Sequence, residues 1–221
     1  EVLSGAAVSG IRLEGANVGG VDVNGRAVDA EVVVDAMGRR SPMRGWLGQL
    51  GCDVPAPRTS QCGVIYYSRY YRVRPGIDLP DGPWIFGPRG ELGYMSFSTF
   101  PGDNRTFAIV LGVPTGVPDL KILMHESAFQ AAVASIPTLM LWASPEMCEP
   151  ITGVLPMGGM QNSLGVLDDP RPAGVFPVAD APCHTDPVLA HGLSFSLIHA
   201  LELAGALRSH GDLHDARAAY R

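Results

Sequence analysis

The stretch that decides the fold runs from Gly174 to Pro187 and reads Gly-Val-Phe-Pro-Val-Ala-Asp-Ala-Pro-Cys-His-Thr-Asp-Pro. Its apolar start predicts a short buried strand, and the residues that follow predict a loop carrying Asp180. Pro187 is typical of the first turn of a helix, where Thr185 or Asp186 can cap the exposed amides. A strand that delivers a carboxylate to a helix N-terminus predicts a seat for a phosphorylated, hydroxylated ligand.

A second short strand precedes another polar loop near the start of the chain. Residues 31–35 read Glu-Val-Val-Val-Asp, and residues 36–42 continue with Ala-Met-Gly-Arg-Arg-Ser-Pro. The apolar run predicts a strand buried in a parallel or mixed sheet. Gly38 predicts a tight turn, and Ser41 is placed to cap a short helix that follows.

The rest of the chain predicts mostly antiparallel strands with a few helices. Asn24-Gly25 is typical of a hairpin turn between 21–23 and 26–28. Closely spaced strands of the kind that form an antiparallel sheet are expected over 62–73, 84–86, 91–97 and 106–113. Further strands are expected over 151–155 and 174–178. Helices are expected over 120–136, 138–143 and, longest of all, 187–210.

Composition excludes several classes of protein. Of the 221 residues, 46% are hydrophobic and 17% are charged, which is typical of a chain with a packed core. The net charge of −6 gives no reason to expect a nucleic acid or an anionic membrane as partner. Four dispersed cysteines without a C-x-x-C pair argue against a disulfide framework and favour the cytoplasm. No apolar run reaches transmembrane length, and no signal peptide is visible.

The motifs at 35–42 and 174–187 together resemble those of the p-hydroxybenzoate hydroxylase-like family of FAD-dependent monooxygenases, which is related to flavin halogenases and geranylgeranyl reductases. In that family the middle motif often reads Asp-Ala-x-Gly-x-x-Ser, and the late motif reads Gly-Asp-Ala followed by Pro and then Gly. The resemblance implies an α/β fold with α+β character. A partial FAD-binding domain is implied over 1–58 and 152–221, and a mainly antiparallel β-sheet substrate domain with helices over 59–151.

The resemblance also implies roles for single residues. Asp180 would accept hydrogen bonds from ribityl or pyrophosphate-side hydroxyls of FAD, because charge-assisted hydrogen bonds are short and directional. Pro187 and the amides up to Gly192 would face the pyrophosphate and the flavin edge, and Gly192 would allow close approach. The loop with Asp35 and Gly38 would lie near the pyrophosphate.

Other residues of the two motifs are less typical of the family. Arg39, Arg40 and Arg44 are candidates to neutralise phosphates, and the alternative is that they are solvated surface residues. Met37 stands where the family's hydroxylases carry a second aspartate, which disfavours direct use of NAD(P)H. Ala179 stands where the family has glycine, which predicts a crowded backbone beside the cofactor.

The fingerprint Gly-x-Gly-x-x-Gly, which grips a dinucleotide in this family, does not occur in the sequence. The glycines over 15–25 fall in hairpin positions and no helix follows them. The chain is therefore expected to be a truncated piece of a longer protein, and to hold FAD weakly or not at all by itself. A truncated α/β fold exposes sheet edges and apolar surface, which predicts self-association.

Among the remaining candidates, Tyr67 and Tyr71 alternate along one predicted strand with their neighbouring tyrosines. They are candidates for the lining of a substrate pocket, and the alternative is that they pack within the sheet. No metal site is expected, because His210 and His214 are separated by Gly211 and lack a third ligand. No catalytic acid or base is assigned, because a flavin carries the hard chemistry itself.

The sequence therefore predicts part of a FAD-dependent oxidoreductase, monooxygenase-like, that acts on a hydrophobic small molecule. NAD(P)H or a flavin reductase is the expected electron source, and a reductase of isoprenoid chains is a variant within the same flavin class. An alternative from another class stays open: a degenerate flavoprotein module that binds a ligand or a protein partner without redox chemistry.

Overall fold

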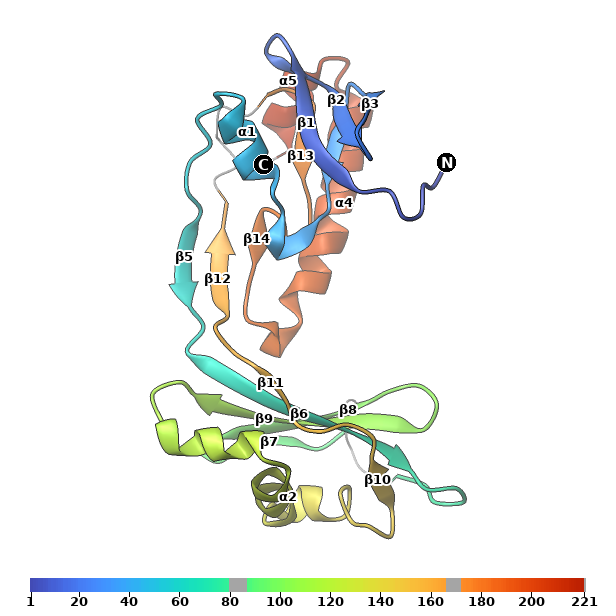
Figure 1. Cartoon of the computed structure of the whole chain (residues 1–221), viewed down its shortest axis with the longest axis vertical. Coiled ribbons are helices and arrows are strands. Elements are labelled where there is room, and N and C mark those ends of the chain that lie inside the picture. The colour runs from blue at the N-terminus through green and yellow to red at the C-terminus, as the bar shows by residue number, and fades with distance from the viewer. Residues whose placement is uncertain (80–86, 166–171, 221) are drawn as a thin grey trace. The chain divides into compact units, whose positions relative to one another are not determined.

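The computed structural model describes residues 1–79, 87–165 and 172–220 (Figure 1). The chain divides into two compact units: Glu1–Ser60 with Gln161–Arg221, here the first unit, and Gln61–Met160, the second unit. The sequence suggested divisions after residues 58 and 151. The later of the two falls at 160 because residues 155–157 pair with the long strand of the second unit.

The first unit begins with an antiparallel meander of three strands, β1 (Val8–Glu14), β2 (Asn17–Val23) and β3 (Arg26–Asp29). Between β2 and β3, Asn24 and Gly25 both have positive φ, 50° and 75°. Two left-handed residues in a two-residue loop match the twist of the flanking strands. The predicted hairpin is confirmed.

The strands of the two motifs pair with each other. β4 (Val33–Asp35) and β13 (Val175–Pro177) run parallel, with Asp35 opposite Pro177. β13 is fully buried, and Phe176 packs against the helical end of the chain. β4 is shorter and more open than predicted: Val34 is 47% exposed, because β13 is the only described strand that pairs with β4.

Helices and a small sheet complete the first unit. A 3₁₀ turn, η1 (Gly38–Arg40), leads into α1 (Met43–Gln49), as the sequence predicts for this segment. β14 (Cys183–His184), β12 (Gln161–Leu164) and β5 (Arg58–Gln61) form a second three-stranded sheet. The chain ends in α4 (His191–Ser209) and α5 (Leu213–Ala219), which pack over Phe176.

The long C-terminal helix starts later than predicted. Residues 187–189 form a separate 3₁₀ turn, η3 (Pro187–Leu189), and α4 starts at His191. Ala190 lies between them with φ 52°, and a left-handed residue cannot continue a right-handed helix.

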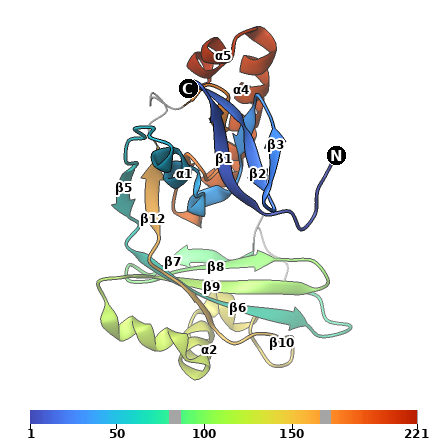
Figure 2. The same ribbon diagram turned by 45° about the horizontal axis from the view of Figure 1, so that its top comes forward.

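The second unit is an antiparallel sheet built around β6 (Val64–Val73), as the sequence predicts (Figure 1). On one side of β6 follow β9 (Thr106–Pro114), β8 (Ser96–Pro101) and β7 (Arg89–Glu91). On its other side lie β10 (Cys148–Pro150) and β11 (Leu155–Met157). The helices η2 (Pro118–Met124), α2 (Glu126–Ala134) and α3 (Pro137–Met140) follow β9. Figure 2 shows α2 on one face of the sheet.

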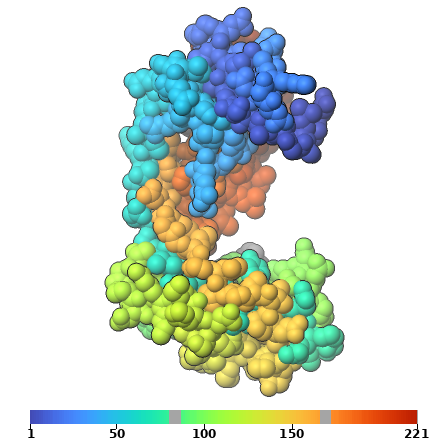
Figure 3. All heavy atoms as spheres, viewed as in Figure 1, coloured from blue at the N-terminus to red at the C-terminus, as the bar shows by residue number. Residues whose placement is uncertain are grey.

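The core of the second unit lies between this sheet and its helices. Phe129, Val133 and Leu139 from the helices are fully buried against Ile109 and Leu111 of β9. Figure 3 shows the green and yellow residues of the helices and of the 141–157 segment on the surface of this unit. The mixture of helices with mostly antiparallel sheets confirms the predicted fold class.

Three predicted elements of the second unit are wrong in detail. The 91–97 strand is two strands joined by a turn, in which Leu92 N–H donates to the Met95 carbonyl at 2.8 Å. The 120–136 helix is broken at His125, whose backbone is extended, and the 151–155 strand starts only at Leu155. The 138–143 helix ends at Met140 and starts at Pro137. The expected strand at 84–86 lies outside the described residues.

Among the helices of the described segments, none has a stretch long and apolar enough to cross a membrane.

Candidate functional site

The loops of the two motifs lie side by side because their strands are parallel neighbours. The carboxyl ends of parallel strands meet at one edge of a sheet, where ligands of α/β folds bind. Val178 N–H donates to the carbonyl of Asp35 at 2.9 Å, which joins the two loops at their start. A Cβ added at Gly38, whose φ is +74°, would stand 4.0 Å from the Cβ of Asp180. The structure thus brings both sequence motifs to one place.

Asp35 shapes the first of these loops. Its side chain is buried, and its Oδ1 accepts a hydrogen bond from Met37 N–H at 3.0 Å. Its Oδ2 accepts from the Ser41 hydroxyl at 2.6 Å, and the Ser41 Oγ accepts from Met43 N–H at 3.2 Å. Ser41 therefore caps α1, as predicted, and both carboxylate oxygens of Asp35 are engaged within their own loop.

Asp180 is placed differently, with its carboxylate beside the first turn of α4. A Cβ added at Gly192 would stand 3.2 Å from Asp180 Oδ1, so only a residue without a side chain fits there at this distance. From the described residues this carboxylate receives no hydrogen bond. Ala190, at the N-cap of α4, offers no side-chain acceptor to the first amides of the helix. An acceptor and a set of helix N-terminal donors therefore lie next to each other.

Pro187 and Asp186 form the turn that leads to α4. Asp186 Oδ1 accepts from Val188 N–H at 2.9 Å, so Asp186, and not Thr185, caps this turn. Asp186 N–H in turn donates to Asn162 Oδ1 at 2.8 Å, which ties the turn to β12. Pro187 is exposed at the start of the turn.

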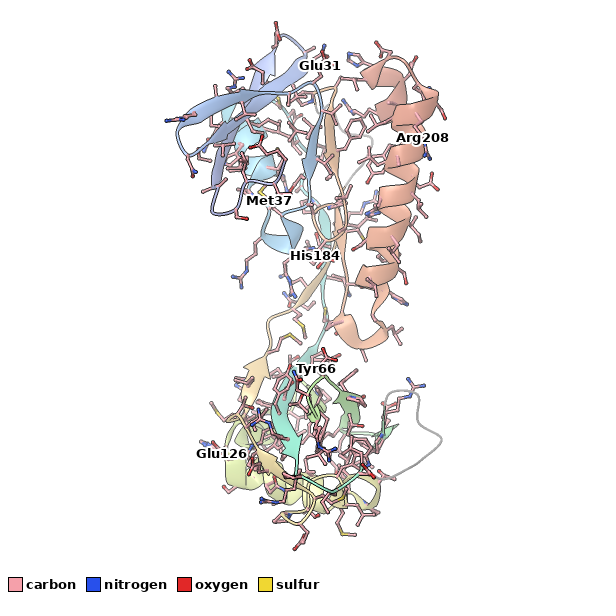
Figure 4. The ribbon with its side chains drawn as sticks, turned by 90° about the vertical axis from the view of Figure 1, so that its right-hand side faces the viewer. Glu31, Met37, Tyr66, Glu126, His184 and Arg208 are labelled. Atoms are coloured by element: carbon pink, nitrogen blue, oxygen red, sulfur yellow. The ribbon has the colours of Figure 1, made fainter. Side chains whose placement is uncertain are left out.

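A cavity of about 180 Å³ lies beside the two loops. Its polar lining consists of Asp35, Arg39, Ser41, Arg44, Ser163 and His184. His184 is fixed from behind, since its Nδ1 lies 3.2 Å from the carbonyl of Asp180 and donates to it. Met37 and His184, labelled in Figure 4, mark the two loops. Arg39 and Arg44 line this cavity, whereas Arg40 does not.

In the second unit the structure places the two candidate pocket tyrosines in the hydrophobic core. Tyr67 and Tyr71 are 3% and 1% exposed. Tyr71 stacks on Phe107 with ring centroids 5.3 Å apart, and its hydroxyl donates to Gln130 Oε1 at 3.0 Å. Burial raises the pKa of Tyr71 to about 12. These contacts favour the packing alternative for both side chains.

The opposite face of this sheet carries the neighbouring tyrosines. Because side chains alternate along a strand, Tyr66 and Tyr70 face away from Tyr67 and Tyr71. Tyr66 is labelled in Figure 4, and Tyr70 is 44% exposed. A Cβ added at Gly112, opposite Tyr66 in the sheet, would stand 2.9 Å from its ring.

Comparison with known proteins identifies the fold. No protein-family model matches the chain. A curated relative, Protein Rv3254 of Mycobacterium tuberculosis, is 25% identical over 190 residues, which cover 82% of this chain and 38% of that protein. Three solved structures align with 97–98% of the chain: the myxobacterial chondrochloren halogenase CndH (TM-score 0.70, 17% identity), Klebsiella pneumoniae HpxO complexed with FAD (0.68, 17%) and tetracycline destructase Tet(55) (0.59, 15%).

The chain has the fold of the FAD-dependent flavoprotein monooxygenases. It spans only 49% of the CndH chain and 54% of the HpxO and Tet(55) chains. The resemblance drawn from the two short motifs is thereby confirmed at the level of the fold.

Outside the two loops of this flavoprotein fold, the described residues hold no group of three or more metal-ligating side chains. Burial raises the pKa of the Cys148 thiol to about 11 and also raises that of Cys183. A thiol with a raised pKa stays protonated at neutral pH and is a poor nucleophile.

Sequence reasoning missed two residues that fix the Asp180 loop. Ala179 has φ 55°, which accounts for the glycine found here in the flavoprotein family, since glycine adopts positive φ without strain. Ala179 N–H donates to Nδ1 of His199 at 3.0 Å. The family glycine gave a signal for Ala179, whereas nothing in the sequence spacing connects His199 to the loop.

Replacing Ala179 by glycine is expected to stabilise the first unit by about 0.5–1 kcal/mol. The left-handed conformation costs a residue with a Cβ about 1–2 kcal/mol, and the greater freedom of glycine in the unfolded chain offsets part of the gain. Ala181→Gly is the matched control, because Ala181 is not among the residues with positive φ, and it is expected to destabilise. Urea denaturation measures both variants, and a shift in the same direction for both would contradict the strain at Ala179.

Proposed function

We propose that the first unit forms part of an FAD site, and that the chain belongs to a FAD-dependent, monooxygenase-like oxidoreductase acting on a hydrophobic small molecule. One observation carries this proposal. Gly38, Asp180 and Gly192, which come from separate parts of the sequence, converge at the carboxyl edge of two parallel strands. The fold shared with CndH, HpxO and Tet(55) supports the proposal.

The chemistry of this edge fits a cofactor with hydroxyl and phosphate groups. The carboxylate of Asp180 is an acceptor suited to ribityl or pyrophosphate-side hydroxyls. Gly192 leaves room beside it for close approach, and the N-terminal amides of α4 are donors suited to a phosphate. Asp35 holds the shape of the Gly38 turn through Met37 and Ser41. Its role toward the cofactor is therefore indirect.

Arg39 and Pro187 complete the proposed set of cofactor-binding residues. Arg39 lies on the wall of the cavity next to the Gly38 turn, where its charge can neutralise a phosphate. Pro187 fixes the start of the turn before α4, which Asp186 caps. A bound flavin would supply the electron transfer and oxygen chemistry, whereas these residues bind it, orient it and exclude water.

We assign the second unit to the substrate. Its sheet packs one face against helices, so the other face, with Tyr66 and Tyr70, is the better candidate for contact with a substrate. NAD(P)H or a separate flavin reductase is the proposed electron source, and Met37 lies 42% exposed on the loop where the family's hydroxylases carry an aspartate. All four cysteines are free thiols, which supports the proposed cytoplasmic location.

A second candidate function is a module that binds a ligand or partner without redox chemistry. The left-handed Ala179 favours it, because a Cβ stands at the position where the flavoprotein family has glycine. The intact arrangement of Asp180 and Gly192 favours the flavin site instead.

Titration with FAD tests the proposal. Asp180→Ala is expected to weaken FAD binding by tenfold or more, because a hydrogen bond to a charged group contributes about 1.5–3 kcal/mol. Asp53→Ala is the matched control, since Asp53 is exposed and its loss changes the net charge equally. The flavin absorption and fluorescence of each variant give the affinity.

Each outcome of this titration has a clear meaning. Weaker binding by Asp180→Ala alone would support the flavin site. Equal binding by both variants would contradict the role of Asp180. No uptake of FAD by any form of the chain would favour the module without redox chemistry.

We also propose that two copies of the chain associate through the outer face of α4. This face and the turn before it expose six large apolar side chains by 51–71%: Val188, Leu189, Leu193, Leu197, Ile198 and Leu201. A contiguous apolar surface of this kind is unusual on a monomer. Leu193 and Leu201 are spaced equally about Leu197, so an antiparallel second helix of the same sequence would match leucine with leucine.

A further inference from the structure

The imidazole of His199 receives a hydrogen bond that fixes its protonation state. Its Nδ1 lies 3.0 Å from the backbone nitrogen of Ala179. A backbone N–H can only donate, so Nδ1 must be an acceptor. The ring is therefore neutral and carries its proton on Nε2. Protonation of Nδ1 would replace the acceptor with a donor and break this hydrogen bond.

The hydrogen bond acts at the strained residue of the loop. Ala179 is left-handed and directly precedes Asp180, the carboxylate that approaches Gly38 and Gly192. A non-glycine residue keeps this conformation only when its surroundings hold it there. The bond from Ala179 N–H to His199 is the polar contact that does so from α4.

Aromatic packing holds the ring of His199 in place. Phe195 stacks on it, with centroids 6.4 Å apart and an interplanar angle of 17°. Tyr220 meets it edge-on at 6.3 Å, and the Tyr220 hydroxyl donates to the carbonyl of Pro177 at 2.8 Å. Pro177 ends β13, the strand that leads into the Asp180 loop. The imidazole thus has a fixed position relative to that strand.

We propose that His199 is a positioning residue: its neutral imidazole holds Ala179 in the left-handed conformation and so places Asp180, and its protonation releases the loop. The coupling between His199 and the loop stands on the geometry alone. The consequence for cofactor binding rests on the proposed function.

The surroundings of His199 set the direction of its pH response. The titratable and charged groups around it are Asp180 on the loop, Tyr220 after α5, and His191 and Glu202 on α4, where Phe195 lies between the two histidine rings. Burial lowers the pKa of His199 from its ordinary value of 6.5. The unfolded chain therefore binds more protons between the folded pKa and 6.5. Stability from the neutral ring is complete above 6.5 and is lost as the pH falls through the folded pKa.

Two substitutions separate the acceptor from the ring. His199→Phe keeps an aromatic ring between Phe195 and Tyr220 and removes the acceptor. His199→Asn places an amide oxygen close to the position of Nδ1 and cannot titrate. In the proposal, the asparagine variant keeps the loop ordered at every pH, whereas the phenylalanine variant loses the order of the loop at neutral pH.

Amide hydrogen exchange measured by NMR is the direct readout. The protection factor of the Ala179 amide is expected to fall about tenfold or more in His199→Phe and to be retained in His199→Asn, with β13 amides unchanged as the internal control. In the unaltered chain the Ala179 amide is expected to lose protection below the pKa of His199. Unchanged protection in His199→Phe, or the same pH dependence in His199→Asn, would overturn the proposal.

Parallel FAD titrations distinguish this proposal from the proposed function. If the exchange results hold and no form binds FAD, His199 positions the loop and the flavin site is wrong. If FAD binds to the unaltered chain and to His199→Phe with equal affinity while the exchange results hold, the loop is positioned but cofactor affinity does not depend on it.

Discussion

Replacing Asp35 by alanine is expected to destabilise the first unit by about 2–3 kcal/mol. Asp35 is 3% exposed, and its carboxylate accepts hydrogen bonds from Met37 N–H and the Ser41 hydroxyl. Each hydrogen bond to a charged group contributes about 1.5–3 kcal/mol, and removing the cost of burying the carboxylate offsets part of the loss. The loop that carries Gly38 and the start of α1 would lose their common anchor.

Asp35→Asn is the matched variant. Its amide keeps one oxygen as an acceptor for Met37 N–H, and its NH₂ group can donate to the Ser41 oxygen. We therefore expect a loss of at most about 1 kcal/mol for asparagine. Urea denaturation gives both values, and amide exchange at Met43 reports on the start of α1. A stability of Asp35→Ala equal to that of the unaltered chain would show that these hydrogen bonds contribute nothing net.

The parts of the site that the sequence predicted are local in origin. A short β-branched run that ends in aspartate and a glycine turn specifies β4 and the Gly38 loop without help from the rest of the fold. The same holds for the hairpin at Asn24-Gly25, where the backbone needs two residues that tolerate positive φ. Asp186 as a cap also follows from its own neighbours.

The parts that the sequence did not predict depend on distant residues. Ala190 stops the helix before α4 although alanine is the best helix former, so tertiary packing overrides propensity there. His125 is extended between η2 and α2 within a continuous helical pattern of apolar residues. Alternation along β6 separates two pairs of tyrosines but does not say which pair meets the helices. In the structure Tyr67 and Tyr71 do.

The contact between His199 and Ala179 illustrates the same limit within the site itself. The two residues are joined by one hydrogen bond between a helix and a loop, and its geometry depends on how α4 packs over β13. No spacing rule relates a helical histidine to the residue before an aspartate. A histidine in this position therefore gains a role only when the fold is known.

Replacing Leu197 by glutamate is expected to turn a self-associating chain into a monomer. Leu197 is 62% exposed at the centre of the apolar face of α4, with Leu193 and Leu201 on either side. Burying a leucine contributes about 1.5–3 kcal/mol, and a symmetric pair of helices loses this contribution twice. Two glutamates would also face each other across the pair. The dissociation constant of the dimer should therefore rise by at least about 100-fold.

Sedimentation velocity over a range of concentrations measures this change. Leu141→Glu is the matched control, because Leu141 is 57% exposed in the second unit and lies outside the face of α4. The control should associate like the unaltered chain. If the unaltered chain sediments as a monomer at high concentration, the face of α4 does not pair with itself. Its leucines would then be a surface for a different partner, because six exposed apolar side chains on one helix and its preceding turn are too costly to leave in water without one.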